Sequence, residues 1–94
     1  MIVSFRDKRT ARFAAGDSLR EFSGFARQAE VRLDRLDSAT NVADLAALPG
    51  NRFETLKGDR AGQYSIRIND QWRICFAWPR GSMGPIDVEI VDYH

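Results

Sequence analysis

The chain is 94 residues long, 44% hydrophobic and 11% aromatic, which is enough apolar material for one compact core and too little chain for two. The composition therefore excludes a disordered polypeptide and predicts one domain over residues 1–94. A single cysteine and a single histidine exclude an internal disulfide and a cysteine-based zinc centre, so we expect no metal site.

The net charge of +1 is spread unevenly along the chain. Residues 51–80 concentrate basic side chains (Arg52, Lys57, Arg60, Arg67, Arg73 and Arg80) over acidic ones (Glu54, Asp59 and Asp70). Such a local basic patch suits a phosphate-bearing partner, although a solvated charged face gives the same pattern. Charges within residues 6–8 come too early for a signal peptide, and no uncharged run approaches the roughly 20 residues that span a bilayer. We therefore expect a cytoplasmic protein without membrane contact.

The N-terminal segment begins with a strand-like run. Residues 1–5 are short, apolar and β-branched, which favours a strand. Asp7 is placed to cap a helix that runs to Ala15, and Gly16 supplies the left-handed residue that often ends one.

A longer helix is predicted next. Ser18 and Glu21 have the spacing of a capping box. Apolar residues follow at helical spacing: Phe22, Phe25, Ala26, Ala29, Leu33 and Leu36. Thr40 or Asn41 is placed to cap a further short helix that stops at Pro49.

The second half of the chain changes to a period of two. Residues 53–57 are extended, residues 58–62 carry turn signals, and apolar residues alternate with polar ones over 64–68 and 72–78. Residues 86–93 form the last predicted strand. Helices first and strands last predict an α+β fold with an antiparallel sheet.

The predicted hairpin has one electrostatic consequence. If residues 69–71 form its loop, Arg67 lies directly opposite Arg73. Like charges paired across strands destabilise a sheet by a fraction of a kcal/mol or more. A compensating anion is needed, and it is either Glu89 or Asp92 on the neighbouring strand or a phosphate.

Three aromatic side chains alternate along the second hairpin strand. Trp72, Phe76 and Trp78 have the form of a base-stacking platform, but their spacing of two favours a place in the core. Cys75 is expected to be a small buried apolar residue.

Four short motifs in this order resemble the HigB branch of the RelE-like toxins. They are L-K-G-D-R-A-G at 56–62, Y-S-I at 64–66, W-R-I-C-F at 72–76 and D-Y-H at 92–94. The resemblance covers most of the chain. It implies a small α+β domain whose N-terminal helices pack on a curved antiparallel sheet. It further implies cleavage of messenger RNA in the A site of the 70S ribosome, and neutralisation by a helix-turn-helix antitoxin similar to HigA.

The resemblance also implies residue roles. The residues expected to carry out cleavage are Lys57, Arg73, Asp92, Tyr93 and His94, and those expected to bind RNA are Arg60 and Arg67. The chain departs from some relatives at position 54, where Glu54 stands in place of a histidine. Glu54 either takes that role or, as we expect, is a surface strand residue.

A ribonuclease without a metal can let the RNA attack itself, with the 2′-hydroxyl adding to the adjacent phosphorus. His94 has an ordinary pKa of about 6.5, which suits proton transfer, unless it is merely a frayed terminal residue. Asp92 either orients the imidazole, acts as the base, or pairs with a strand arginine. Tyr93 either stacks on a base, donates a hydrogen bond or covers the sheet edge. Arg73 offers a planar fork of donors and Lys57 a compact charge, unless both serve only solubility.

Strand alternation opposes this assembly. Counting from Ile86 places Asp92 and His94 on the apolar face, away from Arg67 and Arg73. We therefore predict that the last strand ends, bulges or twists near residue 91.

Two other functions fit the same scaffold. One is a non-nucleolytic toxin similar to ParE that binds DNA gyrase, a branch not expected to carry the terminal residues 92–94. The other is a catalytically silent module that binds RNA or an antitoxin.

Overall fold

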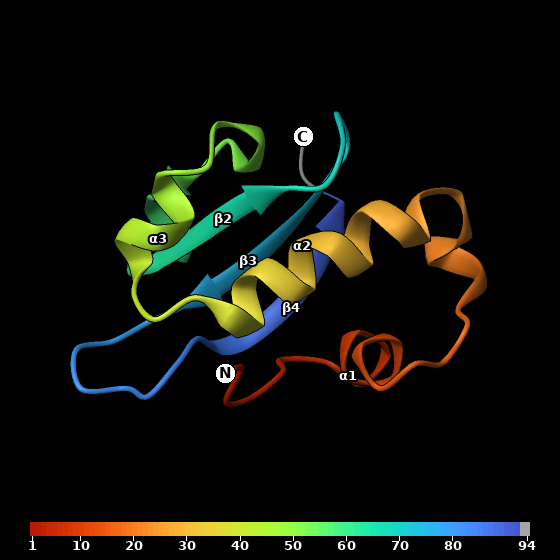
Figure 1. Ribbon diagram of the computed structural model, residues 1–94, viewed down its shortest axis with the longest axis horizontal. Coiled ribbons are helices and arrows are strands. Elements are labelled where there is room, and N and C mark those ends of the chain that lie inside the picture. Colours follow the sequence, from red (N-terminus) through yellow and green to blue (C-terminus); the bar gives the residue numbers. More distant parts are fainter. Residues whose placement is uncertain (93–94) are drawn as a thin grey trace.

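A computed structural model describes residues 1–92 as helices packed on one face of a four-stranded antiparallel sheet with the order β1-β2-β3-β4 (Figure 1). The helical elements are α1 (Lys8–Ala14), η1 (Arg20–Phe25), α2 (Ala26–Ser38), α3 (Val42–Ala46), η2 (Pro49–Asn51) and η3 (Gly58–Arg60). The strands are β1 (Glu54–Thr55), β2 (Gln63–Arg67), β3 (Trp72–Ala77) and β4 (Ile86–Asp92). The predicted α+β class is confirmed.

The N-terminal segment covers the free edge of β4 instead of forming the expected strand. Phe5 makes only an isolated parallel bridge to Val88. The Val88 N–H donates to the Ser4 carbonyl at 3.1 Å, and the Ile90 N–H donates to the hydroxyl of Thr10 on α1 at 3.1 Å. The donors of an edge strand are thereby satisfied by a loop and a helix, which blocks pairing with another chain.

The predicted capping box at Ser18 is wrong. Leu19 precedes η1, a 3-10 helix, and α2 begins only at Ala26. The buried side chains of Phe22 and Phe25 lie three residues apart, which is the repeat of a 3-10 helix. Gly24 between them disfavours an α-helical turn by roughly 1 kcal/mol relative to alanine.

Asn41 is the cap of α3, one of the two candidates that the sequence offered. Its side-chain oxygen accepts from the Asp44 N–H at 3.0 Å. In return, the Asp44 carboxylate accepts from the N–H and the hydroxyl of Thr40, at 2.9 and 2.7 Å. These reciprocal bonds satisfy backbone donors at the start of a helix that is too short to be stable in isolation.

The register of the central hairpin is as predicted. Ile66 pairs with Ile74 and Arg67 pairs with Arg73. The side-chain oxygen of Asn69 closes the loop by accepting from the backbone N–H groups of residues 71 and 72, both at 2.8 Å. β1 is shorter than the extended segment expected over 53–57.

The last strand has no bulge near residue 91 up to residue 92, and the predicted end or twist of the strand after that point lies outside the described residues. Val91 pairs with Arg73 and Asp92 with Trp72 in regular register. The irregularity lies at the other end of β4, where the strand pairs with residues Cys75 to Ala77 of β3. Asp87 of β4 has φ +53° there. This end of β4 follows the loop over residues 79–85 and contacts both β3 and the N-terminal segment. The distortion therefore occurs where the strand is bonded on both sides.

The core lies between the helices and the sheet. Phe22 and Phe76 are fully buried, and Trp72 packs against Phe22 and Phe25 with ring centroids 5.9 and 4.9 Å apart. Trp78, which follows β3, also packs against the core, so the core interpretation of the three alternating aromatics is confirmed. Among the helices within residues 1–92, none combines the length and apolar character needed to cross a bilayer.

Candidate active site

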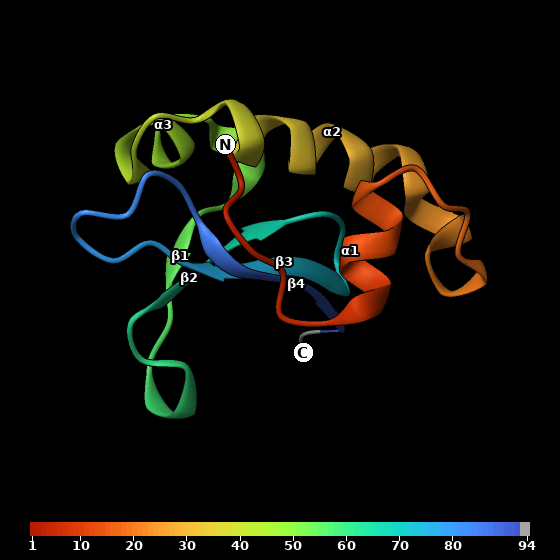
Figure 2. The same ribbon diagram turned by 90° about the horizontal axis from the view of Figure 1, so that it is seen from below.

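The candidate site lies on the sheet face that points away from the helices, here called the open face. Strand alternation places on it Glu54 from β1, Ser65 and Arg67 from β2, Arg73 and Cys75 from β3, and Glu89 from β4. Figure 2 shows η3 projecting from the sheet on the side opposite to α2 and α3. The open face therefore has a wall at its β1 side.

Arg73 is the best-positioned cation of the open face. Its Nε donates to the Ser65 hydroxyl at 2.8 Å, Nη2 donates to the Arg52 carbonyl at 2.5 Å, and Nη1 lies 3.6 Å from Glu54 Oε1. The Arg73 side chain is only 11% exposed. A guanidinium held at three points keeps its planar fork in one orientation, which is what bidentate binding of a phosphate requires.

The like-charged pair of Arg67 and Arg73 is compensated within the described chain. Arg67 pairs with Asp70 of the hairpin loop, and Arg73 pairs with Glu54. Glu89, one of the anions expected for this role, instead pairs with Arg60 at 3.2 Å. The reason is the sheet register, because Glu89 lies opposite Cys75 and not opposite the arginines.

Arg60 crosses the open face from η3. Its Nη1 donates to the side-chain oxygen of Gln63 at 3.0 Å and to Glu89 at 3.2 Å. Cys75 is fully buried although it lies on the open face. Burial raises the pKa of the Cys75 thiol, which keeps it protonated, so the thiol is a packing group as expected.

The expected C-terminal catalytic residues are described only in part. Asp92 is exposed, lies opposite Trp72 and accepts a hydrogen bond from Gln71 Nε2 at 2.9 Å. Tyr93 and His94 lie outside the described residues. The structure therefore places Asp92 at the same end of the sheet as Arg73, but on the helix side by alternation.

Lys57 is not joined to Arg73 by any contact within residues 1–92. It precedes η3 and its side chain is exposed. Its neighbour Leu56 bonds to Gln63, at the end of β2 opposite to Arg67. Four residues of strand correspond to about 13 Å, so Lys57 and Arg73 lie near opposite ends of β2.

Glu54 is an exposed strand residue, as the sequence predicts. It lies on β1 opposite Ser65, with its side chain 54% exposed and paired with Arg73. The available signal of a functional role was its position just before the L-K-G motif, where some relatives carry histidine. A carboxylate beside a fixed guanidinium adds a proton acceptor to the site.

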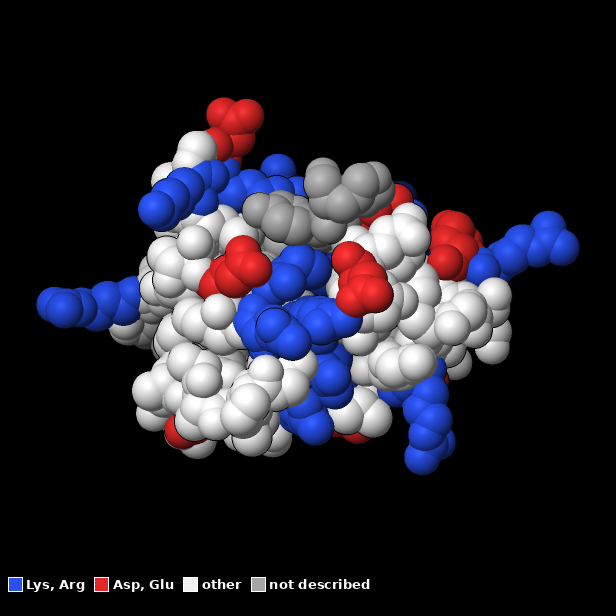
Figure 3. All heavy atoms as spheres, turned by 90° about the horizontal axis from the view of Figure 1, so that it is seen from above, with Lys and Arg blue, Asp and Glu red and all other residues white. Residues whose placement is uncertain are grey.

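Figure 3, which views the molecule from above Figure 1, shows basic side chains gathered in one band with acidic side chains on either side. Arg67 and Arg73 belong to neighbouring strands, and Arg32 of α2 bonds to the Arg67 carbonyl. Within residues 1–92, no group of three or more His, Cys, Asp or Glu residues is arranged to hold a metal ion. The chemistry of the described site is that of cations and carboxylates.

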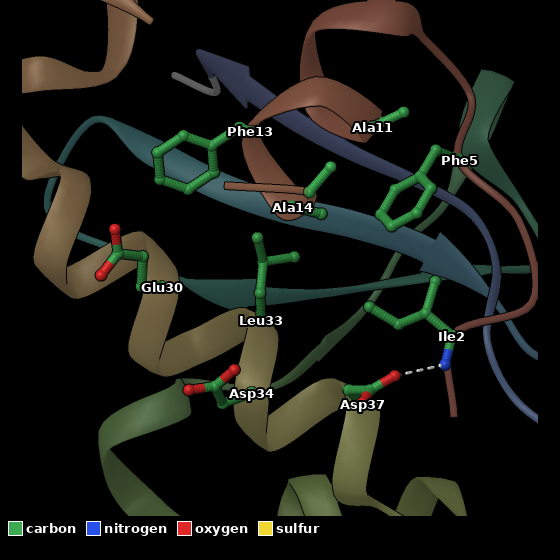
Figure 4. Close-up of a pocket in the computed structure, with 10 residues that line it drawn as sticks. Ile2, Phe5, Ala11, Phe13, Ala14, Glu30, Leu33, Asp34 and Asp37 are labelled. Carbon is green, nitrogen blue, oxygen red and sulfur yellow. Dashed lines mark hydrogen bonds between the residues drawn. The ribbon is translucent and has the colours of Figure 1, made fainter. Parts of the chain in front are cut away.

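A cavity of about 350 Å³ lies elsewhere, between the N-terminal segment, α1 and α2 (Figure 4). Apolar side chains such as Phe5 and Leu33 line it together with Glu30, Asp34 and Asp37. Negative charge at its rim disfavours a polyanion. The cavity is therefore distinct from a nucleic-acid site.

A family model described as the RelE-like toxin of the type II toxin-antitoxin system HigB matches residues 3–94. The chain belongs to the HigB-like toxin family. It is 37% identical over 83 residues to Toxin HigB-1 of Vibrio cholerae, covering 86% of this chain and 87% of that one. It is 37% identical over 67 residues to Endoribonuclease HigB of Proteus vulgaris, covering 67% of this chain and 65% of that one.

Solved structures agree on the fold of this HigB-like chain. A YoeB-YefM complex from Staphylococcus aureus matches with a TM-score of 0.58 at 15% identity, over 100% of this chain and 98% of that one. A YoeB/ParE toxin from Agrobacterium tumefaciens matches with a TM-score of 0.59 at 22% identity, over 99% and 97%. The resemblance to HigB is confirmed, and membership makes the chain a toxin of a type II toxin-antitoxin system, with an antitoxin as its partner.

Proposed function

We propose that this HigB-like toxin is an endoribonuclease that cleaves messenger RNA in the A site of the 70S ribosome without a metal ion. The name of the Proteus vulgaris relative supports the activity. The observation that carries the proposal is the Arg73 guanidinium, held on the open face beside Arg67 and within 3.6 Å of the Glu54 carboxylate. Fixed positive charge next to a proton acceptor is what cleavage of a ribose-phosphate link needs.

The proposed reaction is an internal transesterification. The ribose 2′-hydroxyl loses its proton to a carboxylate, and its oxygen bonds to the adjacent phosphorus. The bond from phosphorus to the 5′-oxygen breaks, and that oxygen takes a proton from His94. The products are a 2′,3′-cyclic phosphate and a free 5′-hydroxyl, with no water consumed and no change of oxidation state.

Each site residue has one role in this proposal. Glu54 accepts the 2′-hydroxyl proton, Asp92 orients the His94 imidazole, and Tyr93 stacks on a base. Arg73 binds the phosphate whose charge grows in the transition state, because its donors are already oriented and need not reorganise. Three further cations support the reaction: Lys57 adds charge from the η3 side, and Arg60 and Arg67 hold the RNA strand.

The proposed partners follow from this activity. The ribosome holds the message in line, since a small site with few groups gains most from a substrate that is already positioned. A helix-turn-helix antitoxin similar to HigA neutralises the toxin. Because ribosomes are the proposed place of action, the proposed location is the cytoplasm.

The decisive experiment measures cleavage of messenger RNA on translating ribosomes, with the new 5′-hydroxyl ends mapped. Arg73→Lys keeps the charge but loses the fork, and His94→Ala removes the proton donor. Each is expected to slow cleavage about 10²- to 10³-fold. Arg80→Lys, in the exposed loop before β4, is the matched control and should cleave normally.

Further variants decide between roles. Undiminished cleavage by both His94→Ala and Lys57→Ala would show the catalytic assignment to be wrong. A loss in Asp92→Asn with none in Glu54→Gln would move the proton acceptor to Asp92. Growth arrest through DNA gyrase, with RNA left intact, would favour the non-nucleolytic function of ParE-like toxins.

A further inference from the structure

Two arginines of α2 converge beside η2 at the edge of the candidate site. Arg32 Nε donates to the Arg67 carbonyl at 2.9 Å, and its Nη2 donates to the Gly50 carbonyl at 3.5 Å. Arg35 Nη1 donates to the side-chain oxygen of Asn51 at 3.2 Å. A Cβ on Gly50 would lie 3.9 Å from both guanidinium groups. Both cations are therefore held over the same small patch of backbone.

The positive charge of this pair is uncompensated within residues 1–92. The acceptors of Arg32 and Arg35 are two carbonyls and one amide, and neither arginine forms an ion pair there. Partial burial, then the charges of Arg35 and Arg67, lower the pKa of Arg32. Like charges held together by neutral partners favour the binding of an external anion.

The pair is continuous with the candidate site. Arg32 bonds to the backbone of Arg67, and Arg67 lies directly opposite Arg73. Figure 3 shows such a gathering of basic side chains on one face of the molecule. The opposite flank of α2 carries Glu30, Asp34 and Asp37 at the cavity. These carboxylates repel a polyanion, which therefore favours the flank that carries Arg32 and Arg35.

We infer that Arg32 and Arg35 form a second phosphate-binding subsite at the sheet edge, for a phosphodiester of the single-stranded RNA where the strand leaves the open face beside Arg67. This inference rests on the proposed function, because it extends the path of the substrate strand. The scissile phosphate lies at Arg73, and a flanking phosphate lies between the two α2 guanidinium groups. The subsite has no base contacts and is therefore indifferent to sequence.

The test is the binding of a fluorescent single-stranded RNA whose 2′-oxygens are methylated, so that it cannot be cleaved, measured by anisotropy at several salt concentrations. The double variant Arg32→Gln/Arg35→Gln is expected to bind at least about tenfold more weakly. Its log–log salt slope should fall by about 0.7 for each phosphate that is no longer neutralised. Arg35→Gln alone, which leaves the Arg32 bonds to the backbone intact, should bind several-fold more weakly and covers the case in which the double variant fails to fold. The matched control is Arg27→Gln, an exposed arginine of the same helix, which should bind like the parent.

Three results of the oligonucleotide measurement would overturn the inference: equal losses in Arg27→Gln and Arg35→Gln, no loss in Arg35→Gln, or no binding of RNA by the parent. A loss of ribosome affinity without any loss for the oligonucleotide would also overturn it, because the pair would then contact the ribosome and not the strand. The cleavage assay judges the proposed function separately, since normal cleavage by the parent with unchanged binding in Arg35→Gln rejects the subsite alone.

Discussion

At the scale of single residues, the partners of a charged group decide what it can do. Arg73 is fixed by a hydroxyl, a carbonyl and a carboxylate, whereas the Lys57 side chain meets no polar partner within residues 1–92. The first is pre-organised to bind a phosphate, and the second must lose side-chain freedom when it does. Asp44 shows the same logic in a structural role, because Thr40 donates to it twice.

Asp44 gives a prediction for acid stability. The hydrogen bonds from the side chain and backbone of Thr40 lower the pKa of Asp44 below its ordinary value. Because the folded pKa is the lower one, the stabilisation is complete above the ordinary carboxyl range and is lost as pH falls through it toward the folded value. We expect Asp44→Asn to be less stable than the parent at pH 7, with the difference shrinking at pH 3, in urea unfolding.

The control for this prediction is Asp34→Asn, because Asp34 is exposed on α2 and forms no ion pair within residues 1–92. Its difference from the parent should not follow the same pH course. If Asp44→Asn keeps the same difference from the parent at both pH values, the carboxylate has no special role.

At the scale of elements, the β2–β3 hairpin determines which cations meet. Its loop fixes the register, and a slip of one residue would turn over one of the two strands, so that either Arg67 or Arg73 would face the core. Asn69 closes that loop through two hydrogen bonds to the backbone. The geometry of the candidate site therefore depends on a residue that does not belong to it.

Asn69→Ala is expected to lower the free energy of unfolding by about 1–2 kcal/mol, since each lost hydrogen bond contributes roughly 0.5–1.5 kcal/mol. Asn69→Asp keeps the accepting oxygen and should retain most of the stability. Urea unfolding followed by tryptophan fluorescence measures both, because Trp72 adjoins the loop. Equal stability of parent and Asn69→Ala would mean that the strands alone set the register.

At the scale of the whole molecule, one aromatic cluster joins the helices to the sheet. Phe22 of η1 contacts Phe13 of α1 at 5.3 Å between ring centroids, and Trp72 of β3 at 5.9 Å. The sheet face beyond this cluster carries the candidate site. The packing that stabilises the domain therefore also supports the strands that carry Arg67 and Arg73.

Phe22→Ala should destabilise the domain by about 3–5 kcal/mol, because a fully buried ring is removed. A domain of this size has a total stability of about 5–15 kcal/mol, and each kcal/mol shifts Tm by roughly 4–8 °C. Calorimetry should thus show a fall in Tm of more than about 10 °C. Val31→Ala, at a site on α2 that is 37% exposed, should change stability by less than about 0.5 kcal/mol. A small shift for Phe22→Ala would show that the cluster is not central to the core.

Structural features that depend on residues close together in the chain could be predicted from the sequence. The alternation of β2 and β3, their register and the pairing of Arg67 with Arg73 follow from a period of two and one short loop. The core position of Trp72 was predicted for the same reason, and the cap of α3 was narrowed to Thr40 or Asn41, because local patterns specify both. The family could also be recognised from the sequence, because each of its motifs is a short contiguous stretch of residues.

Contacts between distant segments were decided only by the tertiary structure. The sequence offered Glu89 or Asp92 as the anions near Arg67 and Arg73, but Glu54 and Asp70 hold those places. It allowed a bulge of β4 near residue 91, whereas up to residue 92 the strand is irregular only where the N-terminal segment joins it. It gave no reason to join Arg32 and Arg35 of α2 to the sheet edge. Local periodicity fixes which face a side chain takes, but which charges meet depends on packing between elements many residues apart.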